Sequence, residues 1–231
     1  MKLPSQLSRM PLRVPGLQYF SLRRVTIGII VIIVFLIYFN IQPQKKKRWY
    51  YYPAPCSYPA QQVNDSITLA VKIDQLLERT KISHVLCYGS LWGALRREDM
   101  LPWDDDIDFC IWNEDLEKLD EAYLYRLFIK EGMSLTYNSI FGEYTVYYKT
   151  ARAELVVFDL SDDYIWLEGV GLRNRMRSSD AKERFPSRLI APPVPKRKFQ
   201  GYEMPVPRGE IEIQKFFYPE DWWLEVRPEG C

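Results

Sequence analysis

Histidine is almost absent from this sequence: the 231 residues contain one, His84. One histidine makes zinc chemistry that depends on histidine ligands improbable in this protein. His84 lies in a short apolar run, and we expect it to have a structural role. The four cysteines are also few, and none lies before residue 56.

Acidic residues are missing from residues 1–56, which contain nine Lys and Arg. The remaining residues hold 22 basic and all 30 acidic residues, and so carry a formal charge of −8. Nucleic-acid binding depends on cationic surface, so we expect no nucleic-acid partner for this acidic part. With 47% hydrophobic and 26% charged residues, the chain is neither wholly disordered nor collagen-like.

Only one long apolar run is present, from Val25 to Ile41, and it contains no charged residue. At about 1.5 Å per residue, a helix of this length just spans a hydrocarbon core of roughly 30 Å. No small-residue cleavage site follows the run, which favours a retained anchor over a cleaved signal peptide. We therefore predict a single-pass transmembrane helix over 25–41, short enough for the thinner bilayers of the early secretory pathway.

The charges that flank this run do not decide its orientation, because five basic residues precede it and four follow it. Asn64-Asp65-Ser66 is a glycosylation sequon, and Asn64 can be used only if this side is luminal. The prediction is a cytoplasmic tail at 1–24, a proline- and tyrosine-containing stem at 42–60, and a luminal domain at 61–231. The expected location is an ER or Golgi membrane.

Residues 61–231 have a mixed α and β pattern. Apolar spacing predicts helices over 63–79, from 91 to about 97, over 114–130 with Asn113 as N-cap and Gly132 as stop, and over 210–217. Short apolar or alternating runs predict strands over 83–88, 107–112, 133–137, 143–148 and 154–160. The proline-rich residues 189–207 are expected to form an extended crossing segment.

Four carboxylates occupy the five positions from Asp104 to Asp108. In a strand, residues two apart face the same side, so Asp106 and Asp108 project together, with Asp104 at the start of the same side. Ile107 and Phe109 then point into the core, which argues against a merely solvated turn. Two such charges about 4 Å apart repel by around 4 kcal/mol near a protein surface, and a divalent cation removes this cost. Oxygen ligands favour Mg²⁺ or Mn²⁺, or Ca²⁺.

A second motif, Tyr88-Gly89-Ser90, lies at the end of a predicted strand and the start of a predicted helix. Glycine allows the backbone to approach a phosphate closely, and the first turn of a helix offers free N–H groups to an anion. A Gly-Ser pair alone is a weak signal. It is stronger here because the alternating acidic strand follows 17 positions later.

Together these motifs resemble the nucleotidyltransferase superfamily, and more narrowly the LicD family, which includes bacterial phosphocholine transferases, fukutin and fukutin-related protein. The resemblance covers about residues 65–225. Its motifs are Tyr-Gly-Ser-Leu-Trp-Gly-Ala-Leu-Arg at 88–96 and Leu-Pro-Trp-Asp-Asp-Asp-Ile-Asp at 101–108. The ending Phe-Tyr-Pro-Glu-Asp-Trp at 217–222 is also similar, with Pro219 in place of the family's usual Gly.

The resemblance implies a nucleotidyltransferase-like α/β (α+β) fold, a mixed sheet flanked by helices, preceded here by the transmembrane helix. It also implies a transferase that moves a phospho-alditol or phosphocholine-type group from a CDP-linked donor to a glycan hydroxyl and releases CMP. Carried over by position, Asp106, Asp108 and Asp159 would hold Mg²⁺ or Mn²⁺, and Asp104 would support them or act as a general base. Gly89, Ser90, Arg96 and Trp103 would contact substrate.

Each of these assignments has a plainer alternative. Asp159 fits equally a simple acid at the end of a strand, and Arg96 fits an ordinary residue on the surface of a helix. Trp103 fits a wall of the site better than a base-stacking platform. Arg173, Arg175 and Arg177 alternate as in an acceptor groove or, more simply, on a solvated strand face.

The cysteines Cys56, Cys87, Cys110 and Cys231 allow three complete disulfide pairings. If the superfamily fold holds, Cys87 and Cys110 lie on neighbouring strands, where we favour buried thiols over a disulfide. A bond between Cys56 and Cys231 would tie the stem to the C-terminal end.

Two other functions remain open. One is a sugar-nucleotide glycosyltransferase, which also uses paired aspartates with a metal ion. The other is a catalytically silent relative that binds a partner glycosyltransferase. The intact acidic set disfavours the silent relative, because mutually repelling acids are needed only where a cation binds.

Overall fold

The computed structural model describes residues 22–41, 53–138, 142–161, 164–167 and 184–231. The chain divides into two compact units, Met1–Arg48 and Trp49–Cys231. The expected cytoplasmic tail lies almost entirely outside the described residues, as do residues 42–52 of the expected stem and the three alternating arginines near 175.

The N-terminal unit contains helix α1, Leu22–Ile41, whose apolar side chains from Val25 to Leu36 are exposed. This helix includes the whole apolar run that the sequence singles out. Within the described parts of the chain, however, no helix meets the length and apolarity needed to cross a membrane. The predicted transmembrane helix over 25–41 is therefore not confirmed.

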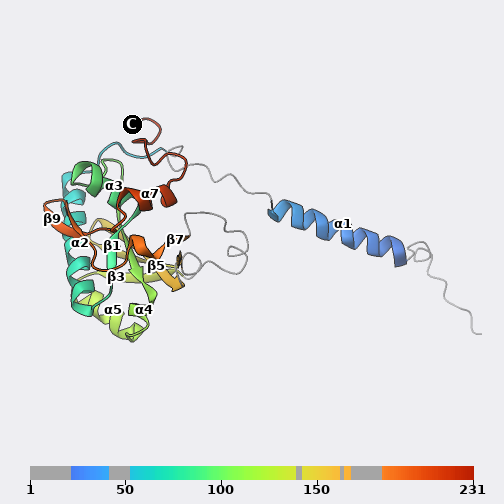
Figure 1. Ribbon diagram of the computed structural model, residues 1–231, viewed down its shortest axis with the longest axis horizontal. Coiled ribbons are helices and arrows are strands. Elements are labelled where there is room, and N and C mark those ends of the chain that lie inside the picture. The colour runs from blue at the N-terminus through green and yellow to red at the C-terminus, as the bar shows by residue number, and fades with distance from the viewer. Residues whose placement is uncertain (1–21, 42–52, 139–141, 162–163, 168–183) are drawn as a thin grey trace, which may run out of the picture. The chain divides into compact units, whose positions relative to one another are not determined.

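A seven-stranded mixed sheet forms the centre of the second unit (Figure 1). The strand order is β1-β2-β5-β4-β3, and β6 and then β7 extend the sheet from β5. Strands β2 and β5 are parallel, and every other pair is antiparallel. The strands are β1 (His84–Leu86), β2 (Asp106–Trp112), β3 (Ser134–Asn138), β4 (Glu143–Tyr148), β5 (Ala151–Ser161), β6 (Tyr164–Leu167) and β7 (Arg184–Pro186).

Helices cover this sheet and supply much of its core (Figure 1). The amphipathic helix α2 (Ala60–Thr80) buries Leu69, Ile73 and Leu77 and contacts β2, β4 and β5. Helix α3 (Tyr88–Arg97) packs on β2 and on the C-terminal helix α7 (Ile211–Phe217). The predicted mixed α/β class, a mixed sheet flanked by helices, is confirmed.

Strand β2 shows how the alternating pattern becomes structure. Ile107 and Phe109 are fully buried in the core, as the sequence predicts. Asp106 and Asp108 are also buried, each with 8% of its surface exposed, because α3 and β5 cover their side of the strand. Burial of a charged strand face on this scale requires a compensating partner.

Two local predictions were wrong. The helix expected over 114–130 is two helices, α4 (Asn113–Leu116) and α5 (Glu121–Lys130). The break arises at Asp120, whose carboxylate accepts a hydrogen bond from the Tyr123 N–H at 2.8 Å and so caps a new helix. Asn113 is the first residue of α4 and not its cap. Gly132, at φ +76°, follows the end of α5, where a left-handed residue is favoured.

The segment 189–207 is also not simply extended. It contains a hairpin of β8 (Lys196–Phe199) and β9 (Tyr202–Pro205), which turns at Gln200 and Gly201. Both turn residues have positive φ, 52° and 83°, and adjacent left-handed residues are the signature of a tight hairpin turn.

All four cysteines are paired. Cys87, directly after β1, is bonded to Cys110 on β2, with the two Cα atoms 5.8 Å apart. The preference for buried thiols at this pair was therefore wrong, although both residues are buried. Cys56 is bonded to Cys231 and so joins the end of the expected stem to the last residue.

His84 has the structural surroundings that the sequence predicts. It is buried on β1, where Nδ1 lies 2.8 Å from the Ile82 carbonyl oxygen and Nε2 lies 2.9 Å from the Asp74 carboxylate. These contacts tie β1 to helix α2.

Candidate active site

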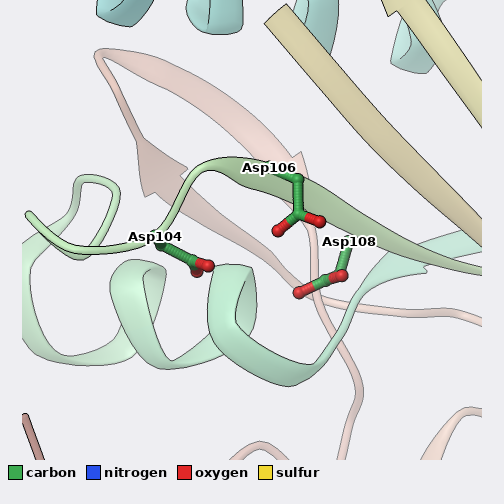
Figure 2. Close-up of side chains that lie close together, drawn as sticks. All are labelled: Asp104, Asp106 and Asp108. Carbon is green, nitrogen blue, oxygen red and sulfur yellow. The ribbon is translucent and has the colours of Figure 1, made fainter. Parts of the chain in front are cut away.

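Three carboxylates meet where β2 begins. One oxygen from each of Asp104, Asp106 and Asp108 lies within 4.8 Å of the others. Figure 2 shows the three side chains converging on the same space, with Asp104 on the loop before the strand. The alternation of the strand produces this group, because residues two apart share a face.

The N-terminus of α3 closes one side of the group. The backbone N–H of Gly89 donates to Asp108 Oδ2 at 3.1 Å, and the Ser90 hydroxyl accepts from the Asp108 N–H at 2.8 Å. The Asp104 carboxylate lies so close to Gly89 that any Cβ at this position would collide with it. A side chain at position 89 would thus force the Asp104 carboxylate to move, whereas the predicted approach of a phosphate to Gly89 stays a prediction.

The first residue of α3 is in a rare conformation. Tyr88 has φ +45°, which a non-glycine residue adopts only when its surroundings impose it. Its ring stacks on Phe217 with 4.2 Å between centroids, and its carbonyl oxygen accepts from Gln214 Nε2 at 3.0 Å. Helix α7 therefore holds the turn that places Gly89 beside the acids.

Burial raises the pKa of every acid in the group. It is the main cause of the pKa of Asp106 rising from 3.8 to about 7, and the nearby Glu154 carboxylate raises it further. Burial, followed by the charge of Asp106, raises the pKa of both Asp104 and Asp108 well above the usual range. The site thus resists holding three negative charges without a cation.

One side-chain cation lies against this acidic face. Arg152 on β5 contacts Asp106 at 2.6 Å, Asp105 at 3.4 Å and Glu154 at 3.4 Å. One guanidinium cannot neutralise all of these carboxylates if they are ionised together.

The register of β5 decides which of its acids lies near the group. Asp106 pairs with Arg152, and Asp108 pairs with Glu154, so Glu154 is the β5 carboxylate beside Asp108. Asp159 is five residues further along, roughly 16 Å at strand spacing, and faces the opposite side of β5. It pairs with Trp166 on β6. The structure thus does not bring Asp159 to the three aspartates.

The sequence interpretation missed Glu154, Glu143 and Arg152. Glu143 lies on the neighbouring strand β4, and burial raises its pKa and that of Glu154. The available signal was the alternation Arg-Ala-Glu-Leu at 152–155, in which polar residues share one face. Their proximity to β2 could not be deduced, because it depends on pairing between distant segments.

A cavity of about 290 Å³ opens beside the acids, near the lower end of the range for small-ligand sites. Asp104, Asp105, Asp108 and Gly89 lie on one part of its wall. The other parts are largely aromatic or aliphatic, contributed by Trp92, Leu101, Trp103, Tyr218, Leu224, Val226 and Pro228. The cavity is therefore lined by both acidic and apolar side chains.

The C-terminal strap, defined here as residues 221–231, supplies part of the apolar wall. Arg96 donates to the carbonyl oxygens of Trp222 at 3.3 Å and Leu224 at 2.8 Å, and its guanidinium lies over the Trp92 ring at 3.8 Å. Arg97 adds an ion pair to Glu225 at 2.6 Å. In this structure Arg96 lines the cavity and its donors hold the strap, so its predicted contact with substrate stays a prediction.

The remaining two predicted residues lie as follows. Trp103 lines the cavity and is 7% exposed, which fits the wall that the sequence suggested. Asn64 is exposed on α2, and its backbone oxygen accepts from the Thr68 hydroxyl. Its glycosylation stays a prediction.

The donor set fits a divalent cation. It consists of three carboxylates with convergent oxygens and raised pKa values, of which Asp106 and Asp108 are buried and Asp104 is partly buried. All-oxygen ligands of this kind are typical of Mg²⁺ and Mn²⁺ sites. Asp104, Asp106 and Asp108 are therefore the residues that could hold a metal ion.

Comparison with known proteins agrees with this site. Residues 81–209, more than half of the chain, match the family model described as LicD/FKTN/FKRP, nucleotidyltransferase domain. The protein therefore belongs to the class of proteins that contain a nucleotidyltransferase domain. The chain belongs to the LicD/FKTN/FKRP family, which confirms the resemblance found in the motifs.

One curated relative is the lipopolysaccharide cholinephosphotransferase LicD of Haemophilus influenzae, 34% identical over 70 residues. The match covers 30% of this chain and 26% of that protein, so the chain aligns with about a quarter of its relative's length. Among solved structures, the chain is similar to ANT(2")-Ia in complex with adenylyl-2"-tobramycin. That similarity has a TM-score of 0.42 and 16% identity, covering 66% of this chain and 75% of the other.

Proposed function

We propose that this protein is a metal-dependent transferase that moves a phospho-alditol or phosphocholine-type group from a CDP-linked donor to a glycan hydroxyl. The observation that carries this proposal is the convergent group of Asp104, Asp106 and Asp108 against the N-terminus of α3. Membership of the LicD/FKTN/FKRP family supports it, as does the cholinephosphotransferase activity in the name of the bacterial relative.

The reaction is a displacement at phosphorus. The acceptor hydroxyl oxygen forms a bond to the phosphorus that carries the transferred group, and the bond from that phosphorus to the bridging oxygen breaks. CMP leaves with the bridging oxygen and its electron pair. The hydroxyl proton must pass to a base, and Asp104, whose carboxylate lies on the loop beside Asp106 and Asp108, is the proposed acceptor.

In this proposal, residues of this chain position the CDP-linked donor. Asp106 and Asp108, with Asp104 nearby, would hold Mg²⁺ or Mn²⁺, which supplies charge neutralisation for the phosphate oxygens when bound. The α3 turn at Gly89 and Ser90 places backbone next to that position. Glu154 replaces Asp159 as the β5 acid that supports the set, because register brings it beside Asp108.

We also propose that the protein is held at an ER or Golgi membrane by residues 25–41, with the domain in the lumen. The uncharged apolar run supports this, and so do the two disulfides, since disulfides persist in oxidising compartments. Protection of the domain from added protease in sealed microsomes, with a glycan on Asn64 that an endoglycosidase removes, is the expected result. Digestion of the domain in intact vesicles would contradict it.

The test of the activity is incubation of the protein with Mn²⁺ or Mg²⁺, CDP-linked and UDP-linked donors and mixed glycan acceptors, followed by phosphorus NMR. Metal-dependent CMP release and a new phosphodiester signal are expected. UDP release would instead identify a sugar-nucleotide glycosyltransferase. Metal and nucleotide binding without turnover, restored by adding a partner glycosyltransferase, would identify a protein that acts through that partner. Absence of metal binding would contradict the proposal.

Asp106→Asn is the matched loss-of-function variant, because it preserves shape and removes one charge. It should lose turnover while remaining folded. Glu203→Gln is its control, since it removes a carboxylate charge at an exposed residue of the β8–β9 hairpin that does not line the cavity. Full turnover by Asp106→Asn would refute the metal assignment.

A further inference from the structure

A second cavity, of about 230 Å³, shares two wall residues, Leu101 and Asp104, with the cavity described above. Its wall residues come from two segments, 57–66 around the start of α2 and 99–104 between α3 and β2. Asp104 therefore belongs both to the acidic group and to the walls of two cavities. A molecule bound in the second cavity would lie against the residue that the proposed reaction uses as its base.

A transfer reaction has to bring two substrates together. In the proposed function the donor lies beside Gly89 and Asp108, which line the first cavity. The acceptor then needs a separate space next to the same acids, because its hydroxyl oxygen must come within bonding distance of the donor's phosphorus. The second cavity borders the acidic group through Asp104.

Tyr58 is a second sign that this cavity is close to the acids. It is partly buried and lines the second cavity. Burial raises the pKa of its phenol, and the charges of Asp105, Asp104 and Asp106 raise the pKa further. The phenol is thus within electrostatic range of the acidic group.

The chemistry of the wall suits a neutral ligand that carries hydroxyl groups. Apolar residues such as Val63 and Met100 suit the C–H surface of a sugar, and the hydroxyl and amide side chains suit its hydroxyls. No Lys or Arg is among the described residues that line this cavity, which disfavours a phosphate or another anion. The polar residues of the wall are Ser57, Tyr58, Gln62, Ser66, Asp99 and Asp104.

The same wall fits the choline part of a donor poorly. Quaternary ammonium groups are held by cages of several aromatic rings. Among the described residues that line the second cavity, Tyr58 is the single aromatic one. The occupant that the wall favours is therefore a sugar unit and not the transferred group.

The α2 side of this cavity is fixed to the body of the domain. Gln62 and Val63 come four and three residues before Ser66, so the three residues share one face of the helix, which borders the cavity. Asp65, 3% exposed, accepts a hydrogen bond from the Thr150 hydroxyl at 2.8 Å. This contact joins the first turns of α2 to the connection between β4 and β5.

We propose that the second cavity binds the sugar unit of the acceptor that carries the reacting hydroxyl, with this hydroxyl beside Asp104. The inference rests on the proposed function, because it places the acceptor of the same transfer. It also assigns acceptor selection in part to residues 57–66, which lie outside residues 81–209 that match the family model.

The experiment measures binding of two kinds of probe to the full-length protein with Mn²⁺. Calorimetry with CMP reports on the donor site. Saturation-transfer difference NMR with methyl glycosides of common hexoses and N-acetylhexosamines, in the presence of CMP, reports on the acceptor site.

Gln62→Trp places a large ring on the face of α2 that borders the second cavity. It should weaken glycoside binding about tenfold or more and change CMP binding less than about twofold. Gln75→Trp is the matched control, at an exposed residue of the same helix that is absent from the walls of both cavities, and it should change neither.

The results separate this inference from the proposed function. Glycoside binding that Gln62→Trp leaves unchanged would overturn the acceptor site and leave the function standing, and so would absence of glycoside binding to wild type. Displacement of the glycoside by choline chloride would also overturn it, because the cavity would then hold the transferred group. Failure of wild type to bind CMP with Mn²⁺ would overturn the proposed function and this inference with it.

Paramagnetic broadening in the wild-type protein provides a measurement that does not depend on how a variant folds. Mn²⁺ at the acids should broaden the proton signals of the bound glycoside, because Asp104 borders both the metal position and the second cavity. Excess Mg²⁺ should remove the broadening. A glycoside that binds without being broadened by Mn²⁺ would lie away from the acids and overturn the inference.

Discussion

Asp106→Asn should stabilise the metal-free protein at alkaline pH, although it removes a residue at the centre of the site. The pKa of Asp106 is 3.8 ordinarily and about 7 in the fold, mainly because the side chain is buried. Between these two values the folded state keeps a proton that the unfolded chain loses. The free energy of unfolding therefore falls as the pH rises from about 4 to about 7.

The size of this loss follows from the two pKa values. One pKa unit corresponds to about 1.36 kcal/mol, so ionisation of Asp106 costs the metal-free fold about 4 kcal/mol once the pH exceeds 7. The value already includes the attraction of Arg152, which lowers the pKa. Asparagine does not ionise and does not bear this cost. The variant should match wild type near pH 4 and exceed it by about 2–4 kcal/mol at pH 8.

The assay is urea denaturation in EDTA at pH 4, 6 and 8, followed by tryptophan fluorescence with the disulfides intact. Saturating Mn²⁺ should reverse the order at pH 8, because a cation that binds only the folded state stabilises wild type more than the variant. Glu203→Gln, at an exposed acid of the β8–β9 hairpin, should behave like wild type throughout. The reasoning is refuted if Asp106→Asn is no more stable than wild type at pH 8 in EDTA, or if both gain equally from Mn²⁺.

Three further predictions concern the fold and the site. Glu154→Gln should lower Mn²⁺ affinity about tenfold in a calorimetric titration, whereas Asp159→Asn should change it less than twofold; the reverse order would contradict the register argument. Cys231→Ser should lower the free energy of unfolding by about 3–5 kcal/mol in urea, because it opens a long disulfide loop; a variant as stable as wild type would exclude that bond. Phe109→Ala should cost about 3–5 kcal/mol, while Tyr202→Ala, at an exposed hairpin residue, should cost less than about 0.5 kcal/mol; similar losses would mean that the core is misplaced.

Local pattern was enough to predict β2 and the acids that it carries. The alternation around Ile107 places Asp106 and Asp108 on one face whatever the strand pairs with, because side-chain alternation is a property of a single strand. The same holds for α2, whose apolar stripe is visible in 63–79 and forms a helix over Ala60–Thr80. The motif at Gly89 was equally local, since it depends on a strand end followed by a helix start.

The sequence alone could not predict which distant strands pair, or in which register. The choice of Asp159 assumed that the acid at the end of an apolar strand reaches the site, whereas the parallel register with β2 brings Glu154 there. A shift of one residue in register turns every side chain to the other face, so no pattern within β5 alone could decide it. The disulfide of Cys87 depends on the same kind of information, the pairing of β1 with β2.

The prediction of a single helix over 114–130 was wrong for a local reason that is visible in the sequence. Asp120 is followed by helix-forming residues, and an aspartate in that position begins a helix as readily as it interrupts one. The hairpin at 196–205 was hidden for the opposite reason, because its prolines suggested an extended chain while Gln200 and Gly201 made the turn.

The bond between Cys56 and Cys231 makes the folded domain a covalent ring, closed across 175 positions of sequence. A protease that cuts one exposed loop of such a ring leaves a single molecule, which separates into two pieces only after reduction. The bond also holds residues 56 and 231 together in space, with their Cα atoms 5.3 Å apart. If the chain were cut in a surface turn such as Gln200–Gly201, the bond between Cys56 and Cys231 would still connect the two parts. We expect such a molecule to keep the same fold and the same disulfide pairing.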